Sequence, residues 1–472
     1  MKARSIHLIG ICGTAMASLA GMLKARGLDV RGSDSAAYPP MSTFLASLGI
    51  PVMQPFCELN LEPAPDLVVV GNAISRGNPE LEYVLDKRLP VVSMAELVYQ
   101  EFIRGHQSLV IAGTHGKTTT TSMAAWIFQY AGRDPSFLVG GIAENFGSSF
   151  AVAEGSEFII EGDEYDTAFF DKGPKFLHYF PDAVILTSVE FDHADIYRDL
   201  EAVKFAFKRL VNLVPRRGRI IAWDGSPNVS ECCAHAFCPV ERYGFAADSY
   251  WRIQDVEYGN ESTRWRVVRD GVPFAEFESP LAGEYNVLNA TAAAALAYSY
   301  GIAPERIAAA LREFRSVKRR LEVRAEITGV TIIDDFAHHP TAIRATLGAL
   351  RKRYPGRRLW AILEPRSNTL RRNVFQHELT ESLAVADRVV LAAVFFKTTD
   401  TLKPEERLDV PAIVGTLNAR GIAASELFDA DAIVSHVVPQ LRSGDVVAIL
   451  SNGGFGGIYE KLPAALKALS SR

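Results

Sequence analysis

The clearest chemical signature in the chain is the loop Gly113-Thr114-His115-Gly116-Lys117-Thr118-Thr119-Thr120. The apolar run 108–112 before it predicts a buried strand, and residues 122–128 after it predict a helix. A loop in that position can wrap phosphates with backbone N–H groups at the start of the helix. Lys117 can then reach the β and γ phosphates, and Thr118 can ligate Mg²⁺. We therefore predict a nucleoside triphosphate site here, with a fortuitous turn as the alternative.

Two acidic segments follow further apolar runs and could hold a metal ion on those phosphates. The first, 161–166, is rich in carboxylates. Mg²⁺ prefers hard oxygen ligands, so one of these carboxylates together with Thr118 could bind it; a solvated acidic loop is the alternative. The second, 188–195, places His193 among three acids. This density favours a metal or phosphate role for His193 over a purely structural one.

Two later segments could act on the same phosphates. Residues 318–322 read Lys-Arg-Arg-Leu-Glu at an expected joint between two units. A charge run is usually a solvated face, but an arginine at a joint can swing onto a γ-phosphate and neutralise developing charge. Residues 334–340 follow a predicted strand and contain His338 and His339. Adjacent histidines cannot easily share one ion, so a substrate or nucleotide contact is favoured.

The pattern of apolar runs predicts an α/β protein of three units that position these motifs. The first unit, 1–106, alternates strands and helices, and its turn at 10–13 with Asp34 resembles a dinucleotide fold with a weak fingerprint. The second, 107–318, holds the phosphate loop and an antiparallel stretch at 250–278. The third, 319–472, has predicted strands at 330–334, 359–363, 388–392 and 446–450.

Composition excludes several classes of function. The formal net charge is −5 at pH 7, so no basic field indicates a nucleic-acid partner. No run of 18 apolar residues predicts a membrane span, and glycines interrupt the N-terminal apolar stretch, which argues against a signal peptide. Five irregularly spaced cysteines suit a reducing cytoplasm, and Cys232, Cys233, His235 and Cys238 predict free thiols more readily than a zinc site. We expect a cytoplasmic protein acting on small charged substrates, and no obligatory protein partner is evident.

Only Thr114 and His115 separate Gly113 from Gly116, so the loop is shorter than the ordinary phosphate-binding pattern and indicates a narrower group. With its companions the chain resembles the Mur ligase family, ATP-dependent enzymes that join amino acids or peptides to UDP-N-acetylmuramate. The matching motifs, in family order, are Gly113-Thr114-His115-Gly116-Lys117-Thr118-Thr119, Asp163-Glu164, Glu190-Phe191-Asp192-His193-Ala194-Asp195, Asn286-Val287-Leu288-Asn289-Ala290, Arg319-Arg320-Leu321-Glu322 and Asp334-Asp335-Phe336-Ala337-His338-His339-Pro340. The resemblance implies a Rossmann-like UDP-binding domain, a central P-loop ATPase domain and a C-terminal Rossmann-like domain that closes over ATP and binds the incoming peptide.

Two activities within the family share this loop and the opening Gly-x-x-Gly-x-x-Met. One adds L-alanine to UDP-N-acetylmuramate, and the other adds the recycled tripeptide L-alanyl-γ-D-glutamyl-meso-diaminopimelate. Several segments resemble the enzymes that add the tripeptide. They are 32–34 with Tyr38-Pro39-Pro40-Met41-Ser42, 71–78, 161–171, 364–369 and 451–457. The resemblance therefore implies tripeptide ligation in peptidoglycan recycling, with L-alanine ligation as the alternative. Tyr285 departs from the family's usual histidine, beside the expected adenine site.

The resemblance also implies roles for single residues. The expected catalytic residues are Lys117, His193, Arg320 and His338, and the expected Mg²⁺ ligands are Thr118, Glu164 and His193. The expected ATP contacts are Gly113, Thr114, His115, Gly116, Lys117, Thr118, Thr119, Asn289, Arg320 and Asp335. The UDP-sugar is expected at Gly13, Thr14, Ala15, Met16, Ser33, Asp34 and Ser75. Because the tripeptide carries several carboxylates, we expect an arginine to bind it, and choose Arg366 with Arg371 and Arg372 nearby.

Two readings from other classes stay open on the residues alone. A nicotinamide oxidoreductase would explain the turn at 10–13 and Asp34, but it leaves the phosphate loop at 113 without a role. A non-catalytic protein that senses ATP and binds a partner would explain the loop. The accompanying acids, His193 and Arg320 argue for retained catalysis.

Overall fold

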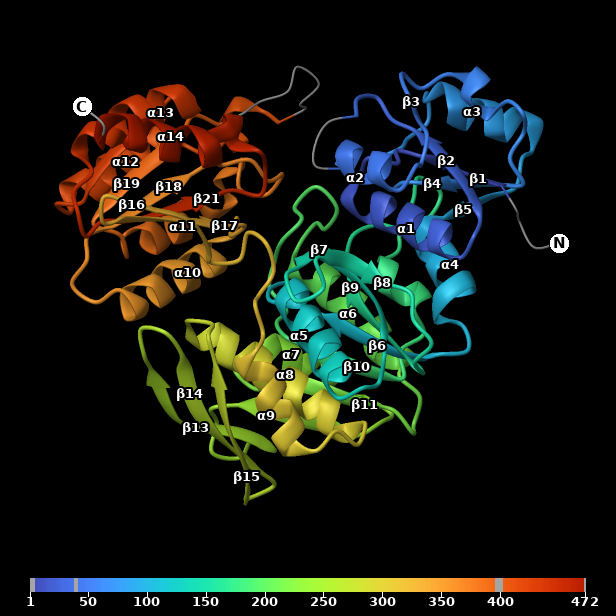
Figure 1. The fold of residues 1–472 in the computed structure, drawn as a ribbon, viewed down its shortest axis with the longest axis horizontal. Helices are drawn as coiled ribbons and strands as arrows, with labels where there is room; N and C mark the ends of the chain where they lie inside the picture. The colour runs from blue at the N-terminus through green and yellow to red at the C-terminus, as the bar shows by residue number, and fades with distance from the viewer. Residues whose placement is uncertain (1–4, 38–40, 395–401, 471–472) are drawn as a thin grey trace.

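Three α/β units follow one another along the chain and lie as three bodies in Figure 1. The computed structural model describes residues 5–37, 41–394 and 402–470. Residues 1–4 and the motif residues Tyr38, Pro39 and Pro40 lie outside them. Each unit is built on its own sheet flanked by helices, which confirms the predicted α/β class and three-domain architecture.

The N-terminal unit is a five-stranded parallel sheet in the order β3-β2-β1-β4-β5. Its strands are β1 (Ser5–Ile9), β2 (Asp29–Ser33), β3 (Val52–Met53), β4 (Leu67–Val70) and β5 (Val91–Ser93). Its helices are α1 (Thr14–Ala25), α2 (Met41–Ser47), α3 (Pro79–Lys87) and α4 (Met94–Val98). The central strands β1 and β4 are almost wholly buried, as expected of parallel strands with helices on both faces, and β1 buries His7 among its apolar residues. The start of α1 therefore opens at the carboxyl edge of the sheet, where ligands of such folds bind.

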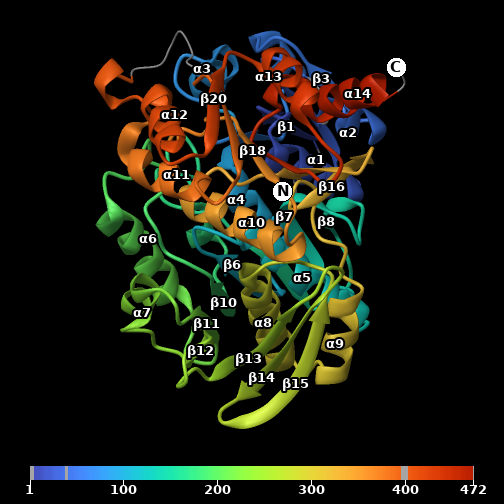
Figure 2. The ribbon, with the colours of Figure 1, turned by 90° about the vertical axis from the view of Figure 1, so that its left-hand side faces the viewer.

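The central unit is a ten-stranded sheet in the order β15-β14-β13-β12-β11-β10-β6-β9-β7-β8. Its strands are β6 (Gln107–Ala112), β7 (Ser136–Ala143), β8 (Ser148–Ala151), β9 (Glu157–Gly162), β10 (Ala183–Leu186), β11 (Arg219–Trp223), β12 (Val240–Gly244), β13 (Trp251–Tyr258), β14 (Thr263–Arg269) and β15 (Val272–Ser279). Its helices are α5 (Lys117–Tyr130), α6 (Leu200–Leu213), α7 (Pro227–Cys233), α8 (Glu284–Ser299) and α9 (Pro304–Arg312). The predicted antiparallel stretch is confirmed in β13–β15, which Figures 1 and 2 place at the end of the molecule away from the N-terminal unit.

The C-terminal unit is a six-stranded sheet in the order β16-β17-β21-β18-β19-β20, in which only β16 is antiparallel to its neighbour. Its strands are β16 (Glu322–Ile327), β17 (Val330–Asp335), β18 (Leu359–Leu363), β19 (Arg388–Ala392), β20 (Ala423–Leu427) and β21 (Val446–Leu450). Its helices are α10 (Pro340–Arg353), α11 (Gln376–Leu383), α12 (Val410–Ala419), α13 (Ala430–Val437) and α14 (Ile458–Ser470). The loops after β17, β18 and β21 leave one edge of the sheet, because these strands are parallel neighbours.

Expectations about membrane spans and about the cysteines also came from the sequence. Within the described ranges no helix is both long and apolar enough to cross a membrane. None of the five cysteines, all of them among the described residues, forms a disulfide, and Cys232, Cys233 and Cys238 are buried.

Candidate active site

The phosphate loop leaves β6 at Ala112 and places Lys117 as the first residue of α5. Gly113 has φ +132° and Gly116 has φ +80°, so the turn needs glycine at both positions. An ideal Cβ on Gly113 would lie 2.2 Å from Thr187 Oγ1, inside the neighbouring strand end. The buried Lys117 ammonium donates to Gly113 O at 2.7 Å. The loop therefore holds the lysine against its own backbone.

Glu164 joins two residues expected at the phosphates. Lys117 Nζ donates to Glu164 Oε2 at 2.8 Å, and His193 Nε2 lies 3.1 Å from Glu164 Oε1. Burial disfavours the charged carboxylate, but Lys117 and His193 outweigh it and lower the pKa of Glu164 to about 2. Burial likewise opposes the charged imidazolium, and the hydrogen bond that it donates to Glu164 outweighs burial and raises the pKa of His193. The three expected residues thus form one buried ionic cluster.

Thr118 forms a hydrogen bond with Glu161, a carboxylate that the sequence analysis did not single out. Its hydroxyl donates to Glu161 Oε1 at 2.8 Å, and Glu161 Oε2 accepts from Gly140 N at 2.7 Å. Burial, with nearby Asp163, raises the pKa of Glu161. Sequence reasoning placed Glu161 in the acidic segment without choosing it. The signal that could have identified it was its position near the end of β9, since β9 pairs with β6, the strand that leads into the phosphate loop.

Arg320 reaches the loop from the joint between the central and C-terminal units. Its Nη2 lies 3.4 Å from Thr118 Oγ1, and its guanidinium lies 5.2 Å from the centre of the Phe336 ring. The carboxylate of Asp335 binds backbone N–H groups close to it in the fold: it accepts from Leu321 N at 2.8 Å and from Ala337 N at 2.9 Å. Asp335 thereby holds the joint on which Arg320 sits, and its expected ribose contact stays a prediction.

A cavity lies beside the loop, where the nucleotide base was expected. It is lined by His115, Gly116, Thr119, Thr187, Ser188, Glu190, Trp223, Tyr243, Tyr285, Asn286, Leu288, Asn289, Ser316, Arg320, Asp335, Ala337, Thr341, Ala342, Ala345 and Thr346. Asn289 approaches the loop so closely that an ideal Cβ on Gly116 would lie 2.7 Å from its Oδ1. The aromatic walls Trp223 and Tyr243 were missed, because they come from strand ends that carry no motif.

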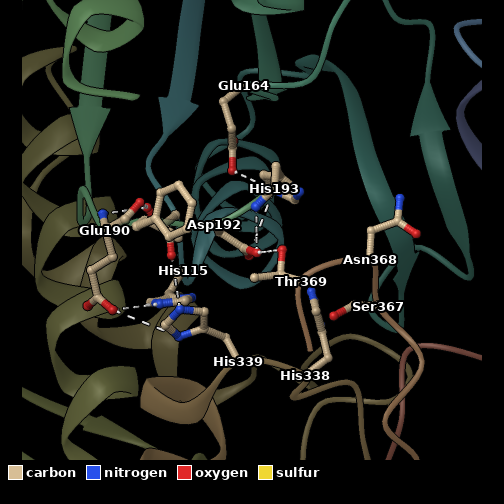
Figure 3. Close-up of polar contacts among 12 residues, drawn as sticks. His115, Glu164, Glu190, Asp192, His193, His338, His339, Ser367, Asn368 and Thr369 are labelled. Atoms are coloured by element: carbon tan, nitrogen blue, oxygen red, sulfur yellow. Dashed lines mark hydrogen bonds and ion pairs between the residues drawn. The ribbon is translucent and has the colours of Figure 1, made fainter. Parts of the chain in front are cut away.

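A second cluster gathers at the boundary between the central and C-terminal units (Figure 3). Glu190 Oε2 accepts from Thr341 Oγ1 at 2.7 Å and lies 3.3 Å from His115 Nε2. His339 Nδ1 lies 3.9 Å from the same oxygen. Burial opposes ionisation of Glu190, but His115 outweighs it and lowers the pKa of Glu190 to about 2. Burial lowers the pKa of His339 to about 4, so its ring is neutral at neutral pH.

The two neighbouring histidines of the C-terminal unit point in different directions, as Figure 3 shows. His339 joins His115, with ring centres 4.6 Å apart. His338 places Nδ1 2.9 Å from Phe336 O, and burial lowers its pKa. This divergence agrees with the expectation that adjacent histidines do not share one ion.

The expected UDP-sugar residues surround the turn between β1 and α1. Gly13 and Thr14 are exposed at the start of α1, Cys12 N donates to Asp34 Oδ2 at 2.9 Å, and Ser75 is exposed in the loop after β4. Ala15 is half-buried and Met16 is buried. Ser33 is fully buried, and its hydroxyl donates to Glu80. The structure thus places the Ser33 side chain in the support beneath the turn and not on its surface.

Arg366, the expected peptide-binding residue, lies in the loop after β18. Its Nη1 donates to Glu364 Oε1 at 3.2 Å, and 43% of its side chain is exposed. It passes over Gly453 so closely that an ideal Cβ there would lie 2.4 Å from Arg366 Cδ. The loop at 451–457 therefore supports the guanidinium from beneath.

Three family models match consecutive parts of the chain. They are the Mur ligase family catalytic domain at 5–106, the Mur ligase middle domain at 111–297 and the Mur ligase glutamate ligase domain at 319–453. The chain is 42% identical to the UDP-N-acetylmuramate–L-alanyl-γ-D-glutamyl-meso-2,6-diaminoheptandioate ligase of Escherichia coli, covering 97% of each. It is 33% identical to the UDP-N-acetylmuramate–L-alanine ligase of Oleidesulfovibrio alaskensis, covering 96% of each. The crystal structure of a murein peptide ligase from Psychrobacter arcticus matches with a TM-score of 0.74 at 36% identity, covering 98% of each chain. The chain therefore belongs to the Mur ligase family.

Proposed function

We propose that this Mur ligase joins L-alanyl-γ-D-glutamyl-meso-diaminopimelate to UDP-N-acetylmuramate, using ATP, in peptidoglycan recycling in the cytoplasm. The observation that carries the reaction type is the cluster of Lys117, Glu164 and His193, with Arg320 reaching Thr118 across the domain boundary. The Escherichia coli ligase named for this tripeptide is 42% identical over nearly the whole chain, against 33% for the L-alanine ligase of Oleidesulfovibrio alaskensis. L-alanine ligation is the second candidate.

The chemistry requires activation of a carboxylate, because its oxygen is a poor leaving group. The lactyl carboxylate of UDP-N-acetylmuramate attacks the γ-phosphorus of ATP, which gives an acyl phosphate and ADP. The amine of the tripeptide then attacks the acyl carbon, and inorganic phosphate leaves. Catalysis of this kind rests on positioning and on neutralising charge. We assign charge neutralisation at the β and γ phosphates to Lys117 and Arg320, and place His338 near the transferred group.

The residues near the loop fit a Mg²⁺ ion. The hydroxyl of Thr118 and the carboxylates of Glu161 and Glu164 are hard oxygen donors, and His193 adds an imidazole beside them. Our assignment of ligands remains Thr118, Glu164 and His193, with Glu161 holding Thr118. The ion, when bound, would offset the negative charge of the phosphates. Lys117 must move from Glu164 to the phosphates as that carboxylate is taken up.

The division of labour follows the three units. We assign UDP-sugar binding to residues 1–106, through Gly13, Thr14, Ala15, Met16, Asp34 and Ser75 with Ser33 as support, ATP binding to 107–318, and peptide binding to 319–472. The adenosine end of ATP fits the cavity beside Asn289, with Asp335 at the ribose, and the backbone of 113–119 fits the phosphates. Arg366 is assigned to a carboxylate of the peptide. Domain closure must therefore precede chemistry.

The deciding experiment measures phosphate release with ATP and UDP-N-acetylmuramate, adding either the tripeptide or L-alanine. We expect the tripeptide to be favoured in kcat/KM by roughly 100-fold or more, since a site with charged partners for a substrate's carboxylates discriminates strongly against an analogue that lacks them. Release that depends equally on L-alanine would support the second candidate. If no phosphate were released with either the tripeptide or L-alanine, both candidate functions would be wrong.

A further inference from the structure

Three potential metal ligands converge at the boundary between the central and C-terminal units, apart from the Lys117–Glu164–His193 cluster. His115 comes from the phosphate loop, Glu190 from the loop after β10, and His339 from the residue before α10. One ligand atom from each lies within 4.8 Å of the others. Figure 3 shows the two imidazoles side by side next to the Glu190 carboxylate, with their ring planes tilted by 48°. The set is two nitrogens and one oxygen.

The hydrogen bonds around His339 fix which of its nitrogens carries the proton. Its Nδ1 accepts from Thr341 N at 3.3 Å, and its Nε2 lies 3.2 Å from Phe191 O, an acceptor. The proton is therefore on Nε2. Nδ1 and Glu190 Oε2 then face each other at 3.9 Å as two electron-rich atoms with no proton between them. A cation placed between them would be bound by both lone pairs, and Thr341 N, at the exposed first turn of α10, would then donate to water.

We propose that His115, Glu190 and His339 bind one divalent transition-metal ion of the Zn²⁺ type, and that this ion fastens the C-terminal unit to the central unit. Neutral imidazoles with one carboxylate are the ligand set that Zn²⁺ and Co²⁺ favour, with a fourth position left for water. Metal–ligand bonds of about 2.0–2.2 Å place ligand atoms a little over 3 Å apart. The 3.3 Å between His115 Nε2 and Glu190 Oε2 already meets this spacing, and a small rotation of His339 completes it.

The site differs in chemistry from the one assigned to Mg²⁺. Of the ligands assigned to Mg²⁺, Thr118 and Glu164 offer oxygens and His193 is the one imidazole, whereas the boundary site offers two imidazoles and one carboxylate. Two of its ligands belong to the central unit and one to the C-terminal unit. A bound ion therefore opposes opening and slows product release, because release requires the units to separate. The inference concerns metal binding and does not rest on the proposed substrate.

The test is a titration of the full, tag-free chain with Zn²⁺ by calorimetry, and with Co²⁺ by visible absorption, in the absence of nucleotide. We expect one site with the visible spectrum of tetrahedral Co²⁺. His339→Asn removes the imidazole but keeps a side chain that caps α10 well. Glu190→Gln keeps the size and the acceptor for Thr341. Each of these two substitutions should weaken Zn²⁺ binding at this site by roughly tenfold or more, since even the loss of a residue that only hydrogen-bonds to a metal ligand has an effect of that size.

The control is His178→Gln, since His178 pairs with Asp171 at 2.8 Å outside the boundary. It should bind Zn²⁺ as the wild type does. Small-angle scattering should show a smaller radius of gyration with Zn²⁺ than without it in the wild type, and no change in His339→Asn. Equal Zn²⁺ affinity in the wild type, His339→Asn and Glu190→Gln would overturn the proposal. So would tight binding that leaves the scattering of the wild type unchanged.

Discussion

Thr369 of the C-terminal unit donates a hydrogen bond of 2.8 Å to Oδ1 of Asp192 in the central unit, and both side chains are buried. The same carboxylate oxygen accepts from His193 N at 2.7 Å, and Ala194 N donates to Thr369 Oγ1 at 3.3 Å. One hydroxyl of the C-terminal unit therefore holds the loop that carries His193 (Figure 3). Since Arg366 lies three residues before Thr369, the loop expected to bind the peptide is tied directly to the phosphate end of the site.

Thr369→Val should therefore impair activity without changing the shape of the core. Valine keeps the volume of threonine but leaves Asp192 without this donor, and a hydrogen bond to a charged group contributes about 1.5–3 kcal/mol. We expect kcat/KM for phosphate release to fall by roughly 10-fold to 100-fold. Asn368→Ala is the matched control, because its bond of 2.8 Å to Asp195 is exposed. Equal effects of the two substitutions would show that the buried bond does not position the loop.

Gly453→Ala should mimic the loss of Arg366 while leaving the arginine in the chain. The added Cβ would lie 2.4 Å from Arg366 Cδ, so the guanidinium must move. We expect KM for the tripeptide to rise about tenfold or more, as for Arg366→Ala, with KM for ATP unchanged. Gly454→Ala is the control, because nothing lies within 4 Å of its ideal Cβ. An unchanged tripeptide KM in Arg366→Ala would show that another residue binds the peptide.

Lys117→Met should abolish most of the ligase activity. The lysine is buried at the start of α5, where Gly113 O and Glu164 hold its ammonium within the phosphate loop. Removing one charge that stabilises the transition state costs roughly 100-fold to 1,000-fold in kcat. Lys172→Ala, which removes an exposed partner of Asp166, is the control and should keep wild-type kcat. Phosphate release by Lys117→Met at near wild-type rate would contradict the assignment.

The His193–Glu164 pair should make stability depend on pH in one direction. Glu164 raises the pKa of His193 above its ordinary 6.5, so the folded chain binds that proton more tightly than the unfolded chain. The resulting stabilisation is complete below pH 6.5 and is lost as the pH rises through the pKa of the folded state. The difference in Tm between wild type and His193→Gln, measured without Mg²⁺ or nucleotide, should shrink from about pH 6 to about pH 9.

Glu164→Gln is the control for this pH dependence, because it removes the partner that raises the His193 pKa. In the Glu164→Gln background, burial is left to lower the pKa of His193, so the Tm difference made by His193→Gln should no longer shrink as the pH rises. A Tm difference between wild type and His193→Gln that stays constant, or grows with pH, would contradict the ion pair.

The sequence alone determined the elements and the type of chemistry. Strands 359–363, 388–392 and 446–450 were predicted at the bounds the structure has, because short apolar runs between polar loops leave little freedom for a buried strand. The loop at 113–120 was likewise readable, since its glycines and Lys117 act through local backbone geometry. Residues 161–166 and 188–195 were recognised as segments because acids, and in the second His193, follow an apolar run in each.

Only the tertiary structure decided which side chains meet. It paired Thr118 with Glu161 and Lys117 with Glu164, and it separated the neighbours His338 and His339. It also turned Ser33 inward and brought Thr369 to Asp192 across the domain boundary. These pairings join residues far apart in the chain, so they depend on sheet register and on how the units dock. Local sequence carries no record of either, because each follows from burying whole faces against one another.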